Sequence, residues 1–97
     1  MSTYGKLLAE CKDLAREVES MKCFDELFER ALDIEFAYDA CREYRSSRLT
    51  VAIGGPGIFI NTRTGMVEGR WMSDCVDVPC DTEALDDALR DYWECAA

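Results

Sequence analysis

"AIGGPGIFINTRTG", residues 52–65, decides the fold because it places two turns around a short apolar run. The glycines of "GGPG" are followed by "IFIN", which is typical of a strand, and "NTRTG" is typical of a hairpin loop with Gly65 at a positive φ. A phosphate-binding loop would lead into a helix and carry G-K-[ST] or G-x-G-x-x-G, and neither motif occurs. We therefore interpret the stretch as turns of an antiparallel sheet.

Strand patterns with a period of two residues continue on both sides of these turns. In "DIEFAYD", residues 33–39, apolar and polar side chains alternate, which predicts a strand with one face in water. "RLTVAI", "GIFIN" and "MVEGRWM" predict three more strands. The side chains expected to face inward from the first, second and fourth strands are Ile34, Phe36, Tyr38, Leu49, Val51, Ile53, Val67 and Trp71.

Helical periodicity flanks these strands. Apolar residues recur every three to four positions over residues 3–20 and 24–31, and again over 82–95, where Asp81 is the expected N-cap. The order ααββββα predicts a single α+β domain over residues 1–97. We expect two layers, with an antiparallel four-stranded meander and the helices packed on one face.

The charge balance is the strongest global signal of the chain. Twenty acids against eleven bases give a net charge of −9 and a pI of about 4.4. Such a surface is repelled by nucleic acid and anionic lipid, so we expect a basic protein partner and no membrane or direct nucleic-acid binding. The chain offers no apolar membrane span, and its first residues lack the apolar core of a signal peptide, so a cytoplasmic location is expected.

Residue types needed for common catalytic chemistry are missing. There is no histidine, which removes Ser–His and Cys–His nucleophile pairs and the commonest metal ligand. The six cysteines are expected to be reduced thiols, with Cys11 in the core, and "CVDVPC" is poorly spaced for zinc. No calcium-binding loop occurs either. We predict a protein that is not an enzyme and needs no metal or cofactor.

The acidic residues are concentrated where they could bind a partner. Residues 74–97 hold eight acids and a single base, Arg90, and the acids of the last helix come about every 3.3 Å, close to the ~3.4 Å charge spacing of one DNA strand. Two hypotheses fit this pattern, a solvated helix face or an imitation of a phosphate backbone. The candidate contact residues are Asp33, Glu35, Asp39, Asp77, Asp81, Glu83, Asp86, Asp87, Asp91 and Glu94.

The blocks "LDIEFAYD" and "LTVAIGGPGIFINTRTGMVEGRW" carry a resemblance that spans roughly residues 32–95. Their "GGP" turn, their "I-x-I-[DN]-T" and "V-x-x-x-W" strands and the acidic C-terminal helix that follows are similar to small anti-CRISPR proteins from phages and mobile elements. Within that family the chain resembles an inhibitor of type I-C systems. Asn61 stands where we expect Asp in many relatives, which removes one charge from the third strand.

The resemblance implies a DNA mimic that evades host defence. Such a protein binds the basic DNA-binding groove of the surveillance (Cascade) complex, on its large subunit, and blocks recognition of target DNA. The alternative is another anti-defence or regulatory module that binds through an apolar patch of Phe59, Met72 or Trp93. A small enzyme would instead require a carboxyl group with a raised pKa in a pocket. The sequence leaves the oligomeric state open, with a monomer favoured.

Overall fold

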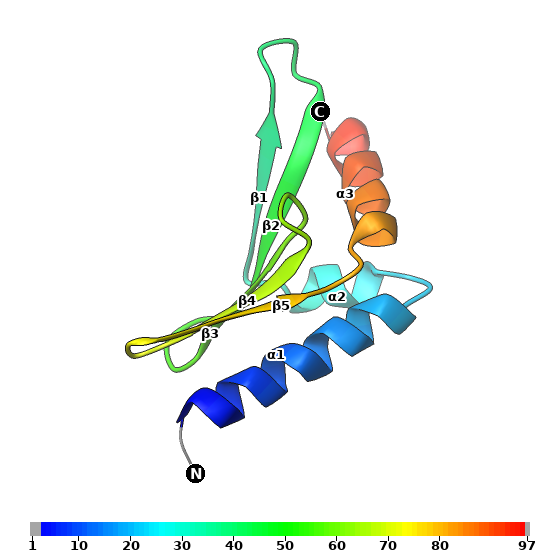
Figure 1. The fold of residues 1–97 in the computed structure, drawn as a ribbon. Coiled ribbons are helices and arrows are strands. Elements are labelled where there is room, and N and C mark those ends of the chain that lie inside the picture. Colours follow the sequence, from blue (N-terminus) through cyan, green and yellow to red (C-terminus); the bar gives the residue numbers. More distant parts are fainter. Residues whose placement is uncertain (1–2, 97) are drawn as a thin grey trace.

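The computed structural model describes residues 3–96, which form three helices and five strands in the order ααβββββα (Figure 1). The strands follow one another across a single antiparallel sheet in the order β1-β2-β3-β4-β5. The element bounds are α1 Thr3–Ser20, α2 Asp25–Arg30, β1 Asp33–Tyr38, β2 Tyr44–Ala52, β3 Gly57–Asn61, β4 Met66–Trp71, β5 Asp74–Pro79 and α3 Glu83–Ala96.

The fifth strand corrects the predicted four-stranded meander. The segment that forms β5 was not predicted as a strand, yet Val76 and Val78 alternate with exposed neighbours and point into the core. Only Met72 and Ser73 separate β4 from β5, and Met72 adopts a φ of 55°. Tight hairpin turns with positive φ normally carry glycine, asparagine or aspartate, so this turn lacks the usual sequence signal.

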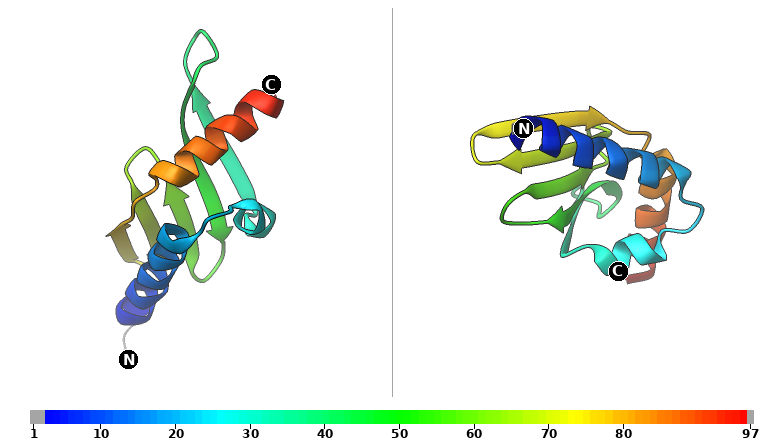
Figure 2. Two further views of the ribbon diagram at one scale, coloured as in Figure 1. Left: turned by 90° about the vertical axis from the view of Figure 1, so that its right-hand side faces the viewer. Right: turned by 90° about the horizontal axis from the view of Figure 1, so that it is seen from below.

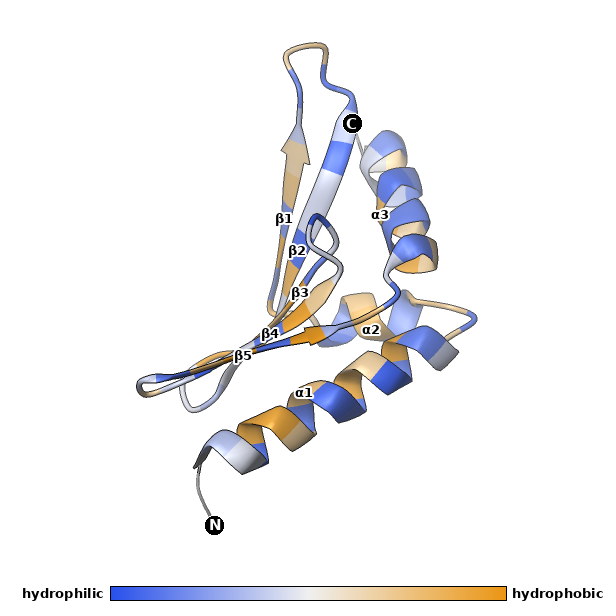
Figure 3. Ribbon diagram, in the orientation of Figure 1, coloured by the Kyte–Doolittle hydropathy of each residue, from blue (hydrophilic) through white to orange (hydrophobic). Residues whose placement is uncertain are grey.

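The helices lie against the apolar side of the sheet. Helix α1 packs on β4 and β5, while α3 packs on β2, as Figures 1 and 2 show. Hydrophobic and hydrophilic residues alternate along both helices (Figure 3), which is the predicted amphipathic pattern. The α+β class and the antiparallel sheet are therefore confirmed.

The core lies between the helices and this sheet face. Its fully buried members are Leu7, Cys11, Leu27, Leu49, Ile60, Val67, Leu85 and Leu89. The predicted inward position of Leu49 is thus confirmed. The prediction for Ile53 is wrong, because β2 ends at Ala52 and the Ile53 side chain is 68% exposed in the following turn.

The glycine-rich stretch is a pair of turns, as predicted. Gly54 lies in the turn between β2 and β3 with a φ of 96°, and Gly65 closes the β3–β4 hairpin with a φ of 65°. The Gly65 N–H donates a hydrogen bond to the Asn61 carbonyl at 3.0 Å. Both conformations are cheap only for glycine, so this stretch shapes the sheet rather than a ligand site.

Candidate functional site

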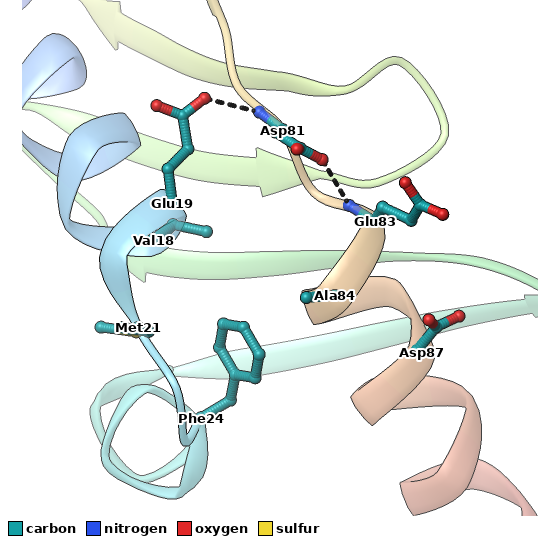
Figure 4. A pocket seen from close by; sticks show the side chains of 8 residues that line it. All are labelled: Val18, Glu19, Met21, Phe24, Asp81, Glu83, Ala84 and Asp87. Carbon is teal, nitrogen blue, oxygen red and sulfur yellow. Dashed lines mark hydrogen bonds between the residues drawn. The ribbon is translucent and has the colours of Figure 1, made fainter.

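Asp81 connects the start of α3 to the end of α1 through one hydrogen bond to each (Figure 4). The Asp81 N–H donates to Oε2 of Glu19 at 2.9 Å, and Oδ1 of Asp81 accepts the N–H of Glu83 at 3.1 Å. Thr82, whose carbonyl accepts the N–H of Asp86, occupies the N-cap position. The predicted cap, Asp81, therefore lies one residue earlier but still satisfies a free N–H of the first turn.

A hollow of about 250 Å³ opens beside this junction (Figure 4). Its apolar floor comes from the end of α1, the loop before α2 and the first turn of α3. Four carboxylates form the rest of its lining. The lining consists of Val18, Met21, Phe24 and Ala84 with the acids Glu19, Asp81, Glu83 and Asp87.

A second hollow of about 570 Å³ lies between α2 and α3. Phe24 lines both hollows, so the two adjoin. The second is lined by Phe24, Phe28, Ala88, Tyr92 and Cys95 with the acids Asp25, Glu29 and Asp91. We call the seven carboxylates of both hollows the acidic helical surface. It consists of Glu19, Asp25, Glu29, Asp81, Glu83, Asp87 and Asp91.

The acidic helical surface carries almost no compensating charge. Among the residues that the structure describes, no lysine or arginine lines either hollow. Arg90 approaches the surface most directly, with its guanidinium 3.6 Å from the carboxylate of Asp87. Glu83, Asp87 and Asp91 are spaced four residues apart and so follow one side of α3 at about 6 Å per step. The arrangement concentrates negative potential over a largely apolar base.

Three members of this surface were not predicted from the sequence. Glu19, Asp25 and Glu29 belong to α1 and α2, and they enter the site only because the fold brings the end of α1 and α2 next to α3. The sequence does show that Asp25 and Glu29, four residues apart, would lie on the same side of a helix. Nothing in the sequence connects that side with α3.

Two of the predicted helix acids lie elsewhere. Asp86 is half-buried and faces the sheet, where its Oδ1 accepts a hydrogen bond from the Tyr44 hydroxyl at 2.6 Å. Glu94 lies on the side of α3 toward the β1–β2 hairpin, in a hollow shared with Arg42 and Arg90. Asp86 therefore has a structural role, and Glu94 is separated from the acidic helical surface.

The acids predicted on strands occupy the opposite face of the sheet. Asp33 and Glu35 alternate with Ile34 and Phe36, whose side chains pack on the core, so both acids point away from the helices. Asp77, which was predicted outside any strand, lies in β5, also faces away from the helices and forms an ion pair with Arg70 at 3.2 Å. The strand acids and the helix acids do not form one continuous surface.

Asp39 is not on the strand but in the turn that follows it. Its carboxylate accepts the N–H groups of Cys41 and Glu43 at 2.9 and 3.0 Å. The hydrogen bond from Glu43 in particular lowers the pKa of the Asp39 carboxyl group. Asp39 therefore lies outside the strand predicted over residues 33–39, because its carboxylate holds the hairpin turn.

The residues of the alternative apolar patch are dispersed. The Arg48 guanidinium lies 4.0 Å from the centre of the Phe59 ring, and Trp93 is half-buried with its ring 4.9 Å from that of Tyr38. Met72 is 90% exposed at the β4–β5 turn. The three candidates lie on different elements and do not form a common patch.

Tyr44 provides a test of the contact that fixes α3. Burial, and then its hydrogen bond to Asp86, raise the pKa of Tyr44 to about 12. Because the pKa of Tyr44 is higher in the folded state, the protonated side chain contributes its full stability to the fold below the ordinary pKa of 10. This stability is lost as the pH rises from 10 through about 12. Tyr44→Phe is expected to lower the free energy of unfolding by about 1–2 kcal/mol at pH 7 and to remove that alkaline loss. Urea denaturation at a series of pH values measures both effects.

Tyr38→Phe is the matched control for this variant. Tyr38 also stacks on an aromatic ring, that of Trp93, but the residue is 54% exposed and no hydrogen bond of its hydroxyl is seen in the described residues. Its free energy of unfolding is expected to stay within about 0.5 kcal/mol of the parent value. Equal effects of the two variants would show that the Tyr44–Asp86 bond does not fix α3.

The described residues contain no grouping of histidine, cysteine, aspartate and glutamate that could hold a metal ion. All six cysteines, each within those residues, are free thiols, and Cys11 and Cys80 are buried. Burial raises the pKa of the Cys80 thiol to about 11. In residues 3–96 every helix is too short or too polar to cross a lipid bilayer.

Comparison of the chain with models of protein families, with curated proteins and with solved structures finds no match.

Proposed function

We propose that this protein is an anti-CRISPR inhibitor that uses the acidic helical surface as a substitute for the phosphates of DNA. The observation that carries this proposal is the set of seven carboxylates around two adjoining hollows, which no basic side chain lines within the described residues. Acids gathered in this way repel one another, a cost that solubility alone does not require. The resemblance of residues 32–95 to anti-CRISPR proteins supports the same function.

The proposed partner is the basic groove with which the type I-C surveillance complex engages duplex DNA, on its large subunit. Lysine and arginine side chains of that groove would form charge-assisted pairs with the carboxylates. Along α3 the side that carries Glu83, Asp87 and Asp91 presents a charge about every 6 Å, comparable with every second phosphate of a DNA strand at ~6.8 Å. The protein would act as a monomer in the bacterial cytoplasm, without catalysis or a cofactor.

Competition with DNA tests this proposal directly. Purified surveillance complex is mixed with labelled target duplex and rising amounts of the protein at about 50 and 200 mM salt. We expect displacement of the duplex, with a half-inhibitory concentration about tenfold higher at the higher salt, because salt screens exposed charges. Binding without displacement would place the contact outside the DNA groove. No binding would eliminate the surveillance complex as the partner.

A further inference from the structure

The hollow between α2 and α3 has an apolar base of a kind that a pure phosphate mimic does not need. Phe24, Phe28, Ala88 and Tyr92 form this base. The Tyr92 ring stacks on Phe36 with 6.0 Å between centroids and meets Phe28 edge-on at 5.9 Å. Even with these neighbours Tyr92 remains 50% exposed, so aromatic surface is held open to solvent in a fixed orientation.

Acids stand on both sides of this apolar base. Asp25 and Glu29 come from α2 and Asp91 from α3, and across the described residues none of the three side chains takes part in an ion pair. An occupant therefore meets apolar surface in the centre and negative charge at the edges. A second copy of the chain, with its own net charge of −9, is electrostatically disfavoured there.

We propose that this hollow, the α2–α3 groove, seats an apolar side chain from a basic amphipathic segment of the partner. The segment would carry a leucine, isoleucine or methionine in the groove, with lysine or arginine on either side pairing with Asp25, Glu29 and Asp91. This inference rests on the proposed function, because it assigns the segment to the basic DNA-binding protein that the inhibitor occupies.

The groove would make the inhibitor specific for one basic protein among many. Carboxylates alone would attract any DNA-binding surface, since charge attraction carries little shape information. An apolar side chain that fits the groove adds affinity that salt does not screen. Part of the binding should therefore persist at salt concentrations that abolish the purely ionic part.

Two synthetic peptides of equal length and charge test the groove without the surveillance complex. One is a 14-residue amphipathic peptide of leucine and lysine, and the other has serine at every leucine position. Fluorescence anisotropy is expected to give at least tenfold tighter binding of the leucine peptide. Amide chemical shifts of Phe28, Ala88 and Tyr92 should change with that peptide alone. Equal affinities for the two peptides would overturn the inference.

Two charge reversals on α3 localise the peptide. Asp91 lines the groove, whereas Glu94 lies on the hairpin side of the same helix, and each change to lysine alters the net charge equally. Asp91→Lys is expected to weaken the leucine peptide at least tenfold and Glu94→Lys less than threefold. Equal weakening by both variants would also overturn the inference.

The outcomes separate this inference from the proposed function. Selective binding of the leucine peptide, together with failure to displace DNA from the surveillance complex, would leave the groove in place and remove the proposed function. Displacement of DNA together with equal peptide affinities would retain the proposed function and remove the groove as an apolar docking site.

Discussion

The variant with Asp87→Lys and Asp91→Lys is expected to displace target DNA from the surveillance complex about 100-fold less well than the parent protein, a loss of about 2.7 kcal/mol. Both carboxylates lie on the side of α3 that lines the two hollows. Reversing them sets like charges against a basic groove, and close like charges across an interface cost several kcal/mol. The half-inhibitory concentration in the competition assay measures the effect.

The control for this variant is Asp33→Lys with Glu35→Lys. It changes the net charge by the same amount, but both residues are exposed on the face of the sheet that points away from the helices. We expect its half-inhibitory concentration to stay within about threefold of the parent value. If the two double variants lose inhibition equally, net charge and not the acidic helical surface governs binding. Thermal unfolding of each variant verifies that the fold is intact.

Gly69→Ala is expected to lower the free energy of unfolding by about 3 kcal/mol, since overpacking of a core is strongly destabilising. Gly69 lies in β4 beneath α1, and a Cβ at this position would be 2.6 Å from Sγ of Cys11 and 2.9 Å from Cδ1 of Leu7. Those contacts are too short, so the side chains of Cys11 and Leu7, or α1 as a whole, would have to shift. Urea denaturation followed by circular dichroism measures the loss.

Gly57→Ala is the matched change in the neighbouring strand. A Cβ at Gly57 would meet the Phe59 ring at 3.4 Å, which is an ordinary packing distance. Its expected cost is about 1 kcal/mol or less. If Gly69→Ala is as mild as Gly57→Ala, the close approach of α1 to β4 does not depend on the missing side chain.

Periodicity carried most of the fold prediction. The helices and β1 to β4 follow from apolar spacings of three to four residues or of two. The missed strand, β5, shows the limit of this method. Val76 and Val78 show the two-residue period of a strand. The turn before them, however, has Met72 at a positive φ, and its sequence contains none of the residues that usually form such turns.

The candidate site could be predicted only in part. Glu83, Asp87 and Asp91 were among the contact residues predicted from the sequence, but so was Asp86, which instead turns toward Tyr44, a residue 42 positions away. Such contacts depend on how α3 is placed on the sheet. For the same reason the sequence does not place Glu19 in the site, since its hydrogen bond to Asp81 joins residues 62 positions apart.

The two sides of the molecule differ in their balance of charge. Residues 81–96 hold six acids against Arg90, whereas residues 33–80 hold seven acids against five arginines, among them Arg48 and Arg70 on the sheet face that points away from the helices. This asymmetry gives the protein an electric dipole whose negative end lies toward α3. In the field of a positively charged partner, such a dipole experiences a torque that turns α3 forward before the surfaces touch. With the proposed basic partner, productive encounters would then be more frequent than random tumbling allows.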